Sequence, residues 1–353
     1  MSTNVLKFGG TSLCSAAEMT NAASIVNDDG DACAVIVSAP GKRTADDEKV
    51  TDVLYKICLF PNERDTLVEW LKRRFDEILR SIGTNIDFSD EYEKIAAAAE
   101  RGDTPYVVSR GEYFSARIMA DILGYTFVDA ADVIAFDGAG TFLKEKTYSN
   151  IASRSKDGEK FVLPGFYGAE SNGKIFVFPR GGSDITGAVA AAALDADVYK
   201  NYTDVDGFMF ADPKYMKSPR MIGKMSYPEA YFLSSYGAGV IHGDAVLYAG
   251  EKNIPINIKN TFAPDKKGTL ISNASESDGI YGVAGRRGYF GKDVSAVAVG
   301  CSGRQAKHIA RCMRILHRKN IRERFLINDG TGFIFGVDDG CFDTVMRLFA
   351  EKL

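Results

Sequence analysis

The sequence predicts an α/β fold in which helices cover both faces of a mostly parallel central sheet, followed by a small α+β domain. Three observations predict it. Short apolar runs alternate with helical patterns over about the first 260 residues, as in parallel sheets. Polar, glycine-containing loops follow several of these runs, which is where such sheets bind ligands. From Gly279 onward the chain is basic, with 13 Lys and Arg against 7 Asp and Glu.

The individual elements follow from the same patterns. A first strand is expected over residues 4–6 and a helix over about 15–26. Residues 34–37 form a continuous apolar run, and residues 50–100 show helical spacing. Further strands are expected at 106–109, 127–128, 161–163, 175–178, 199–203 and 255–258, and helices at 112–123 and 187–194. After a loose polar linker we expect a helix over 304–319, strands over 324–327 and 332–337, and a last helix from Phe342.

Length and composition bound the class of protein. The 353 residues fit two domains, which we place at 1–275 and 276–353. A net charge of −4 argues against a nucleic-acid partner, so the basic face of the tail helix is most simply a solvated surface. The six cysteines have no CxxC pair or metal-ligand spacing, which indicates reduced thiols in a cytoplasmic protein. No apolar run is long enough to span a membrane.

The stretch Lys7-Phe8-Gly9-Gly10-Thr11-Ser12-Leu13 is the most informative part of the chain. Gly9 and Gly10 lack a Cβ atom, so the chain can turn sharply and offer its N–H groups to phosphate oxygens. The following helix would point its positive end at the same place. Lys7 would supply a full charge where charge builds up during phosphoryl transfer. An ordinary strand–turn–helix with a surface lysine explains the same residues.

A second loop of this character is Arg180-Gly181-Gly182-Ser183-Asp184, after the strand expected at 175–178. Arg180 can bind a carboxylate in a bidentate fork. Asp184 can hold Lys7 or a magnesium ion. The alternative is a plain helix start with Ser183 or Asp184 as the N-cap. Because two such loops at strand ends suggest one shared site, the functional interpretation is favoured.

Two further loops are candidates. Arg110-Gly111-Glu112 follows the strand expected at 106–109, and Glu112 suits an ammonium group or the first turn of a helix. Residues 203–214 form a turn-rich loop that could hold the base and ribose of a nucleotide, or be a surface loop. The patterns GxxxxGK[ST] and GxGxxG are absent, so neither a P-loop nor a dinucleotide fold is expected.

Four motifs resemble aspartate kinase in order and spacing: KFGGTS at 7–12, SRGE at 109–112, RGGSD at 180–184 and TDVDG…ADP at 203–213. Residues 35–52 and 254–261 resemble the branch common in Gram-positive bacteria. The resemblance covers about residues 4–272. It implies an amino-acid-kinase-like three-layer sandwich that transfers the ATP γ-phosphoryl group to the β-carboxylate of L-aspartate. The product, 4-phospho-L-aspartate, leads to lysine, threonine and methionine.

The resemblance also implies roles for matching residues. Lys7 would neutralise the transferring phosphoryl group, and Asp184 would orient it. Glu112 and Arg180 would hold the charged groups of aspartate, in a pocket lined by Ser38, Thr51 and Ser183. ATP would contact Lys7, Gly9, Gly10, Thr203, Asp204, Asp212 and Lys214. A carboxylate is already a nucleophile, so alignment and charge neutralisation can suffice. Mg²⁺ would arrive with ATP, and no metal-binding residue is assigned.

The chain departs from the family pattern in two places. Many relatives carry a lysine beside ATP where this chain has Gly239, so Lys214 or Lys259 could supply the missing cation. Relatives usually carry two ACT regulatory modules, whereas residues 276–353 suffice for one ACT-like unit without its final strand. Feedback control by lysine or threonine is therefore not expected. The unpaired strand edge of such a unit predicts a homodimer through the tail.

Two other functions compete with this interpretation. N-acetylglutamate kinase and glutamate 5-kinase share the fold and the acyl-phosphate product, but residues 8–12 and the helical region 50–100 favour aspartate kinase. A catalytically silent amino-acid sensor is the alternative from another class. Retention of Lys7, Arg180 and Asp184 argues against it.

Overall fold

The computed structural model describes residues 3–155, 158–179, 181–275 and 278–353. The chain divides into two compact units, each formed by separate stretches of sequence. The first unit holds Met1–Asp204 and Asn260–Pro264, and the second holds Val205–Lys259 and Asp265–Leu353. This division by packing does not follow the boundary expected near residue 275. The assignment of catalytic and regulatory roles to the two sides of that boundary stays a prediction.

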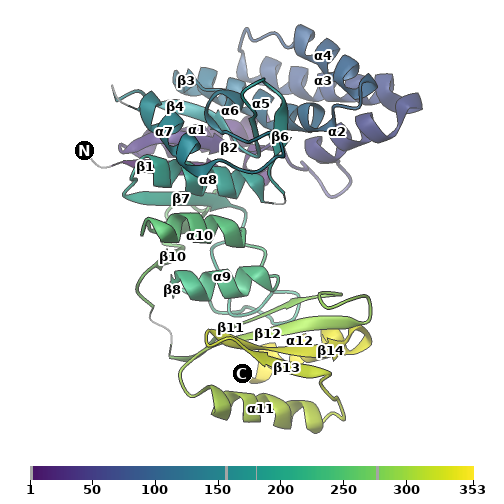
Figure 1. Ribbon diagram of the computed structural model, residues 1–353, viewed down its shortest axis with the longest axis vertical. Coiled ribbons are helices and arrows are strands. Elements are labelled where there is room, and N and C mark those ends of the chain that lie inside the picture. The colour runs from purple at the N-terminus through teal and green to yellow at the C-terminus, as the bar shows by residue number, and fades with distance from the viewer. Residues whose placement is uncertain (1–2, 156–157, 180, 276–277) are drawn as a thin grey trace. The chain divides into compact units, whose positions relative to one another are not determined.

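The first unit is built around a parallel sheet (Figure 1). Its strands lie in the order β3, β4, β2, β1, β7, and every pairing among them is parallel. They are β1 (Asn4–Phe8), β2 (Ala32–Val37), β3 (Thr126–Phe127), β4 (Phe161–Pro164) and β7 (Val198–Thr203). Every residue of β1 is buried, as expected for a strand covered on both faces. The strands expected at these places are confirmed.

Helices cover this sheet as the sequence predicts. On one side α1 and α5 pack against the strands, with α2, α3 and α4 around α5, while α8 and its neighbour α7 lie on the other side. The helices are α1 (Ala16–Asp28), α2 (Val50–Leu59), α3 (Arg64–Ile82), α4 (Ser89–Glu100), α5 (Thr104–Leu123), α6 (Ala130–Val133), α7 (Lys144–Arg154) and α8 (Gly182–Ala193), with short turns η1 (Thr11–Leu13) and η2 (Pro61–Glu63). The strand expected at 175–178 is β6 (Ile175–Val177). It pairs with β5 (Tyr167–Ala169) in a separate two-stranded hairpin.

Alternation along β1 decides which layer each side chain enters. Leu6 and Phe8 belong to the core formed with α1, α3 and α5, where the ring of Phe8 stacks on Tyr202 at 5.0 Å. Successive side chains of a strand point to opposite faces. Lys7 therefore lies on the α8 face, at the carboxyl end of β1, and is only 7% exposed.

One expected strand is wrong, because residues 106–109 lie inside α5. Asp103 caps this helix by accepting the N–H of Tyr106, and a proline occupies the first turn. The adjacent valines at 107 and 108 favour a strand by propensity, yet both are fully buried in the helical core. Glu112 thus projects from the middle of a helix rather than from a strand end.

The strands of the second unit fall into two groups. In the first group, β10 (Thr269–Ser272) pairs parallel with β8 (Lys224–Ser226) and antiparallel with β9 (Ile256–Asn260). Its helices are α9 (Tyr227–Ser235) and α10 (Gly243–Glu251). The stretch expected as a loose linker therefore includes a strand, β10.

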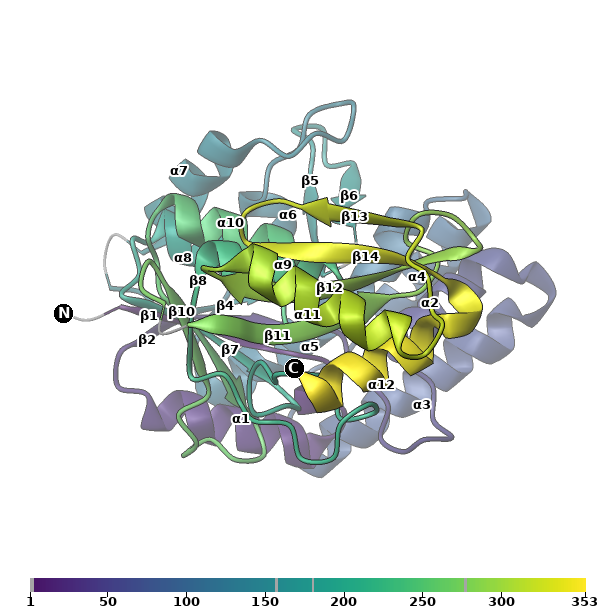
Figure 2. The same cartoon turned by 90° about the horizontal axis from the view of Figure 1, so that it is seen from below.

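The tail forms an antiparallel sheet with strand order β11 (Gly279–Arg286), β12 (Val294–Ser302), β14 (Gly332–Asp338), β13 (Phe325–Asn328). It lies between α9 on one face and α11 (Gln305–His317) with α12 (Phe342–Lys352) on the other (Figures 1 and 2). The short turn η3 (Asp339–Cys341) precedes α12. The helices and strands expected in the tail are confirmed.

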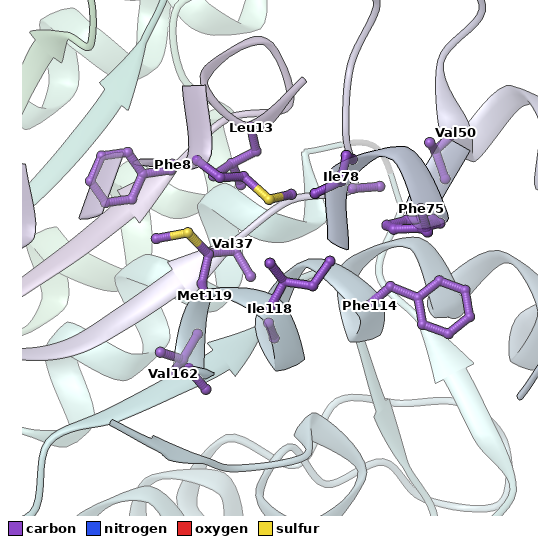
Figure 3. Packing of buried hydrophobic residues seen from close by; sticks show 14 of the residues in the cluster. Phe8, Leu13, Val37, Val50, Phe75, Ile78, Phe114, Ile118, Met119 and Val162 are labelled. Atoms are coloured by element: carbon purple, nitrogen blue, oxygen red, sulfur yellow. The ribbon is translucent and has the colours of Figure 1, made fainter. Parts of the chain in front are cut away.

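The core of the first unit is centred on aromatic rings of the helical layer. Phe114 is fully buried, with ring centroids 4.7 Å from Phe75, 4.4 Å from Phe88 and 5.5 Å from Tyr92. Figure 3 shows Phe114, Ile118 and Met119 following α5 along this core. This packing fixes α5, and therefore the position of Glu112.

We expect Phe114→Ala to lower the free energy of unfolding of the first unit by about 3–5 kcal/mol, because it leaves a cavity among these rings. Urea denaturation followed by circular dichroism measures the change. Phe60→Ala is the matched control, since Phe60 is 47% exposed and its truncation should cost about 1 kcal/mol or less. Equal losses in the two variants would contradict this description of the core.

Candidate active site

A pocket of about 800 Å³ opens at the carboxyl ends of β1, β2 and β4, within the first unit. Lys7 reaches it from β1, Gly10 from the turn after β1, and Ser38 from the loop after β2. Ser183 and Asp184 reach it from the first turn of α8. Strand ends are the usual ligand position in such sheets, and the volume suits a small-molecule ligand.

An ion pair between Lys7 and Asp184 crosses this pocket from strand to helix. Lys7 Nζ lies 2.6 Å from Asp184 Oδ1, with side chains 9% and 15% exposed. Helix α8 begins at Gly182, after Gly181 in the left-handed region at φ 77°. Ser183 and Asp184 are therefore first-turn residues, and the alternative that one of them is the N-cap is wrong. The pair sets a cation and a carboxylate side by side at the sheet edge.

Gly10 is required by a close approach of two loops. A Cβ atom at Gly10 would lie 2.8 Å from the carbonyl oxygen of Ala39. The N–H of Gly41 donates to the carbonyl of Gly10 at 2.8 Å. Gly10 itself has φ −60°, so no left-handed turn is involved. The two loops after β1 and β2 are thereby joined into one wall of the pocket.

The N–H groups near Gly9 are arranged differently from the sequence expectation. The N–H of Gly9 donates to the carbonyl of Tyr202 at 3.0 Å. Because η1 intervenes, α1 begins only at Ala16, and its first turn is not among the residues that line this pocket. The expectation that α1 points its positive end into the site is wrong. The helix N-termini that line the pocket are those of α8, with Ser183 and Asp184, and of α2 (Val50–Leu59), with its N-cap Lys49 and Thr51.

Glu112 places a buried carboxyl group at the pocket. It is 5% exposed, and its Oε2 has no hydrogen-bond partner among the described residues. Burial raises the pKa of Glu112 to about 8, although the N–H of Ala39 and the charge of Arg110 act in the opposite direction. A buried, incompletely satisfied carboxyl group that lines a cleft is typical of a binding site for a cationic group.

Arg110 supports this part of α5 without lining the pocket. Its guanidinium lies over the rings of Tyr106, Tyr113 and Tyr167, at 4.4, 4.6 and 5.2 Å from their centroids. It is 4% exposed. This stacked arrangement holds a positive charge in the core behind Glu112.

The predicted amino-acid-binding residues are brought together by the fold, as far as they are described. Ser38, Thr51, Glu112 and Ser183 all line the pocket. Arg180 lies outside the described residues. Their predicted role as the aspartate site stays a prediction.

The predicted nucleotide-binding residues belong to both units, and among them Lys7 and Gly10 line the pocket. Thr203 ends β7, and its hydroxyl donates to Asp204 Oδ1 at 3.3 Å. Neither residue lines the pocket. The remaining ones, Asp212, Lys214 and Lys259, belong to the second unit. There the Nζ of Lys214 lies 3.9 Å from Asp343 Oδ1.

Several residues that line the pocket were given no role from the sequence, among them Lys49, Asp52, Tyr55 and Phe166. Phe166 follows β4 with φ 78°, which is unusual for a residue with a side chain. A Cβ atom at the preceding Gly165 would lie 2.6 Å from Ser183 Oγ. The Gly-Phe pair after an apolar strand was the available signal. Lys49 belongs to the 35–52 stretch that carries the family resemblance, whereas Tyr55 carries no motif.

The described residues hold neither a metal-binding cluster nor a membrane-spanning helix. Residues 3–155, 158–179, 181–275 and 278–353 contain no group of three or more His, Cys, Asp or Glu side chains placed to hold a metal ion. Nor does any helix among these residues have the length and apolar character needed to cross a membrane.

Comparison with known proteins points to one family. The model of the amino acid kinase family matches residues 2–260. Aspartokinase 3 of Bacillus subtilis is 34% identical over 307 residues, which cover 81% of this chain and 67% of that protein. Aspartokinase of Chlamydia trachomatis is 27% identical over 285 residues, covering 76% and 64%. The chain thus spans about two thirds of the length of these relatives.

Solved structures agree with the sequence comparison. The crystal structure of Clostridium acetobutylicum aspartate kinase superposes with a TM-score of 0.83 at 28% identity, covering 99% of both chains. Escherichia coli aspartokinase III, solved in complex with aspartate and ADP, shares the fold with a TM-score of 0.75 at 24% identity, over 96% of this chain and 79% of that chain. This chain belongs to the amino acid kinase family, among its aspartokinases.

Proposed function

We propose that this protein is an aspartate kinase, which transfers the γ-phosphoryl group of ATP to the β-carboxylate of L-aspartate. The observation that carries the proposal is one pocket that holds the Lys7–Asp184 ion pair together with the buried carboxyl group of Glu112. An acceptor with an ammonium group and a nucleophilic carboxylate fits this set of charges. Aspartokinase relatives support the same reaction.

The proposed step needs alignment rather than a strong base. A β-carboxylate oxygen attacks the γ-phosphorus, the bond from that phosphorus to the β–γ bridging oxygen breaks, and ADP leaves with the electron pair. Lys7 stabilises the negative charge on the transferring group, and Asp184 holds Lys7 in place. The amide groups at the start of α8 add a positive dipole at the same edge.

Glu112 is proposed to bind the ammonium group of aspartate, with Ser38, Thr51 and Ser183 around the amino acid. Arg180 is proposed to bind a carboxylate of the substrate, on the ground of its guanidinium group alone. ATP is proposed to contact Gly9, Gly10, Thr203, Asp204, Asp212, Lys214 and Lys259. Mg²⁺ is proposed to arrive on the ATP phosphates, so no residue is assigned to it.

A cytoplasmic location is proposed from the six free cysteines.

The reaction can be tested by trapping its product. Acyl phosphates react with hydroxylamine, so aspartate, ATP and Mg²⁺ should give aspartyl hydroxamate and ADP. N-acetylglutamate and glutamate serve as competing acceptors in the same assay. Preferred turnover of either would replace the proposed substrate, and no turnover with any acceptor would support a silent sensor instead.

We also propose a homodimer through the tail. Strand β13 ends the tail sheet and pairs with β14. Its Leu326 and Ile327 are 38% and 41% exposed, and an exposed apolar edge strand favours pairing with another chain. Light scattering should give twice the chain mass at micromolar concentration, and Ile327→Lys should shift the protein toward monomer. A stable wild-type monomer would contradict the proposal.

We expect Lys7→Met to lower kcat by about 100- to 1,000-fold, because the charge that stabilises the transferring phosphoryl group is lost. Lys200→Met is the matched control. Lys200 lies on β7, pairs with Asp29 at 2.6 Å and does not line the pocket. Its kcat should stay within about threefold of the wild type. Steady-state kinetics with saturating aspartate and ATP decide between the two, and an unimpaired Lys7→Met enzyme would remove Lys7 from the mechanism.

We expect the KM for aspartate to fall as pH rises from about 6.5 to 8.5. In the free protein the pKa of Glu112 is about 8, so below that pH its carboxyl group is mostly neutral and must lose a proton before it can pair with an ammonium group. The fall should approach tenfold per pH unit below the pKa. Glu112→Gln should raise the KM and abolish this pH dependence. A wild-type KM that is flat over this range would contradict the assignment.

A further inference from the structure

Asn201 is a fully buried polar residue in β7 whose place the proposed reaction does not explain. In the parallel pairing of β1 with β7 it stands opposite Lys7, so both side chains enter the α8 layer. Its Nδ2 donates to Asp184 Oδ1 at 3.0 Å. This is the same oxygen that Lys7 approaches to 2.6 Å. Asn201 therefore shares the carboxylate with the proposed catalytic lysine.

Tyr199 extends this contact to the backbone of α8. It lies two residues before Asn201 on the same face, and its hydroxyl accepts from Asn201 Nδ2 at 3.1 Å and donates to the carbonyl of Asp184 at 3.2 Å. Gly187 makes room for it, because a Cβ atom there would lie 2.4 Å from the hydroxyl oxygen. The first turn of α8 is thus held through both the side chain and the backbone of Asp184.

Stability of the sheet does not account for an asparagine at this position. Its Oδ1 has no hydrogen-bond partner among the described residues, and a buried polar atom left unsatisfied is unfavourable. An apolar residue of the same volume would avoid that cost. Asparagine provides an uncharged hydrogen-bond donor. It can hold the Asp184 carboxylate without replacing the ion pair that Lys7 makes with it.

We propose that Asn201 is a positioning residue that holds the Asp184 carboxylate while Lys7 turns from it toward the transferring phosphoryl group. This inference rests on the proposed function. Lys7 has to exchange part of its contact with Asp184 for one with phosphate oxygens, and Asn201 keeps its own hydrogen bond to Asp184 during that exchange. The carboxylate then remains in position, so that the ion pair with Lys7 can form again after ADP leaves.

The test replaces the donor by an apolar side chain with the same branching and the same number of non-hydrogen atoms. Asn201→Leu should lower kcat for aspartate-dependent ATP turnover by about 10- to 100-fold, a typical cost of a misplaced catalytic group. The KM for aspartate should stay within about twofold, because Asn201 does not line the pocket. Asn4→Leu is the matched control: Asn4, on β1, is 5% exposed and donates to Asp29 Oδ1 at 2.9 Å. Its kcat should not change.

A pH profile separates positioning from a general effect on the fold. Asn201→Asp sets a second carboxylate beside Asp184, and two such groups bind one proton with a raised pKa. The protonated form regains an O–H donor. The kcat of Asn201→Asp relative to wild type should therefore rise severalfold as pH falls from about 8 to about 6. The same ratio for Asn201→Leu should stay flat.

Circular dichroism and thermal unfolding establish that each variant is folded. If Asn201→Leu does not fold, the isosteric Asn201→Asp decides through its pH profile. A kcat of Asn201→Leu within twofold of Asn4→Leu would overturn the inference, and so would a flat profile for Asn201→Asp. Wild-type protein without aspartate-dependent turnover would overturn the proposed function, and this inference with it.

Discussion

The site depends on one interaction, the ion pair that joins Lys7 at the end of β1 to Asp184 in the first turn of α8. Taking two charges out of water is costly unless further hydrogen bonds compensate. The neighbouring strand provides one from Asn201, and Tyr199 ties the same turn of helix through its carbonyl. Strand register and helix start are thereby fixed relative to each other, and the pocket is the space that opens beside them.

The pocket combines charges of both signs, each buried by a different layer. The sheet and α8 contribute Lys7 and Asp184, and α5 contributes Glu112 from the opposite side of the sheet edge. An amino acid with a second carboxylate carries complementary groups at both ends of this arrangement. Burial keeps the interactions strong, because the local dielectric is low and water is partly excluded. Specificity and charge stabilisation thus come from the same packing that stabilises the fold.

The sequence was sufficient where the determinants are local. Apolar runs located the strands of the parallel sheet, and the residue types at the end of β1 and the start of α8 indicated that Asp184 could hold Lys7 or a magnesium ion. It was insufficient where distant segments decide. The residues before Glu112 favour a strand by propensity, but burial makes them helical. Gly10 is required by its close approach to the loop after β2 rather than by its own turn. Asn201 lies beside Lys7 because of the register of β7 with β1, which the sequence does not reveal.

The most direct test of this account is a crystal structure with L-aspartate and a non-hydrolysable ATP analogue. The account predicts the ammonium group of aspartate at the Glu112 carboxylate, with its β-carboxylate facing the γ-phosphate, and Lys7 Nζ within hydrogen-bond distance of both that phosphate and Asp184. A nucleotide bound with its terminal phosphate away from Lys7, or aspartate bound outside the pocket, would contradict it.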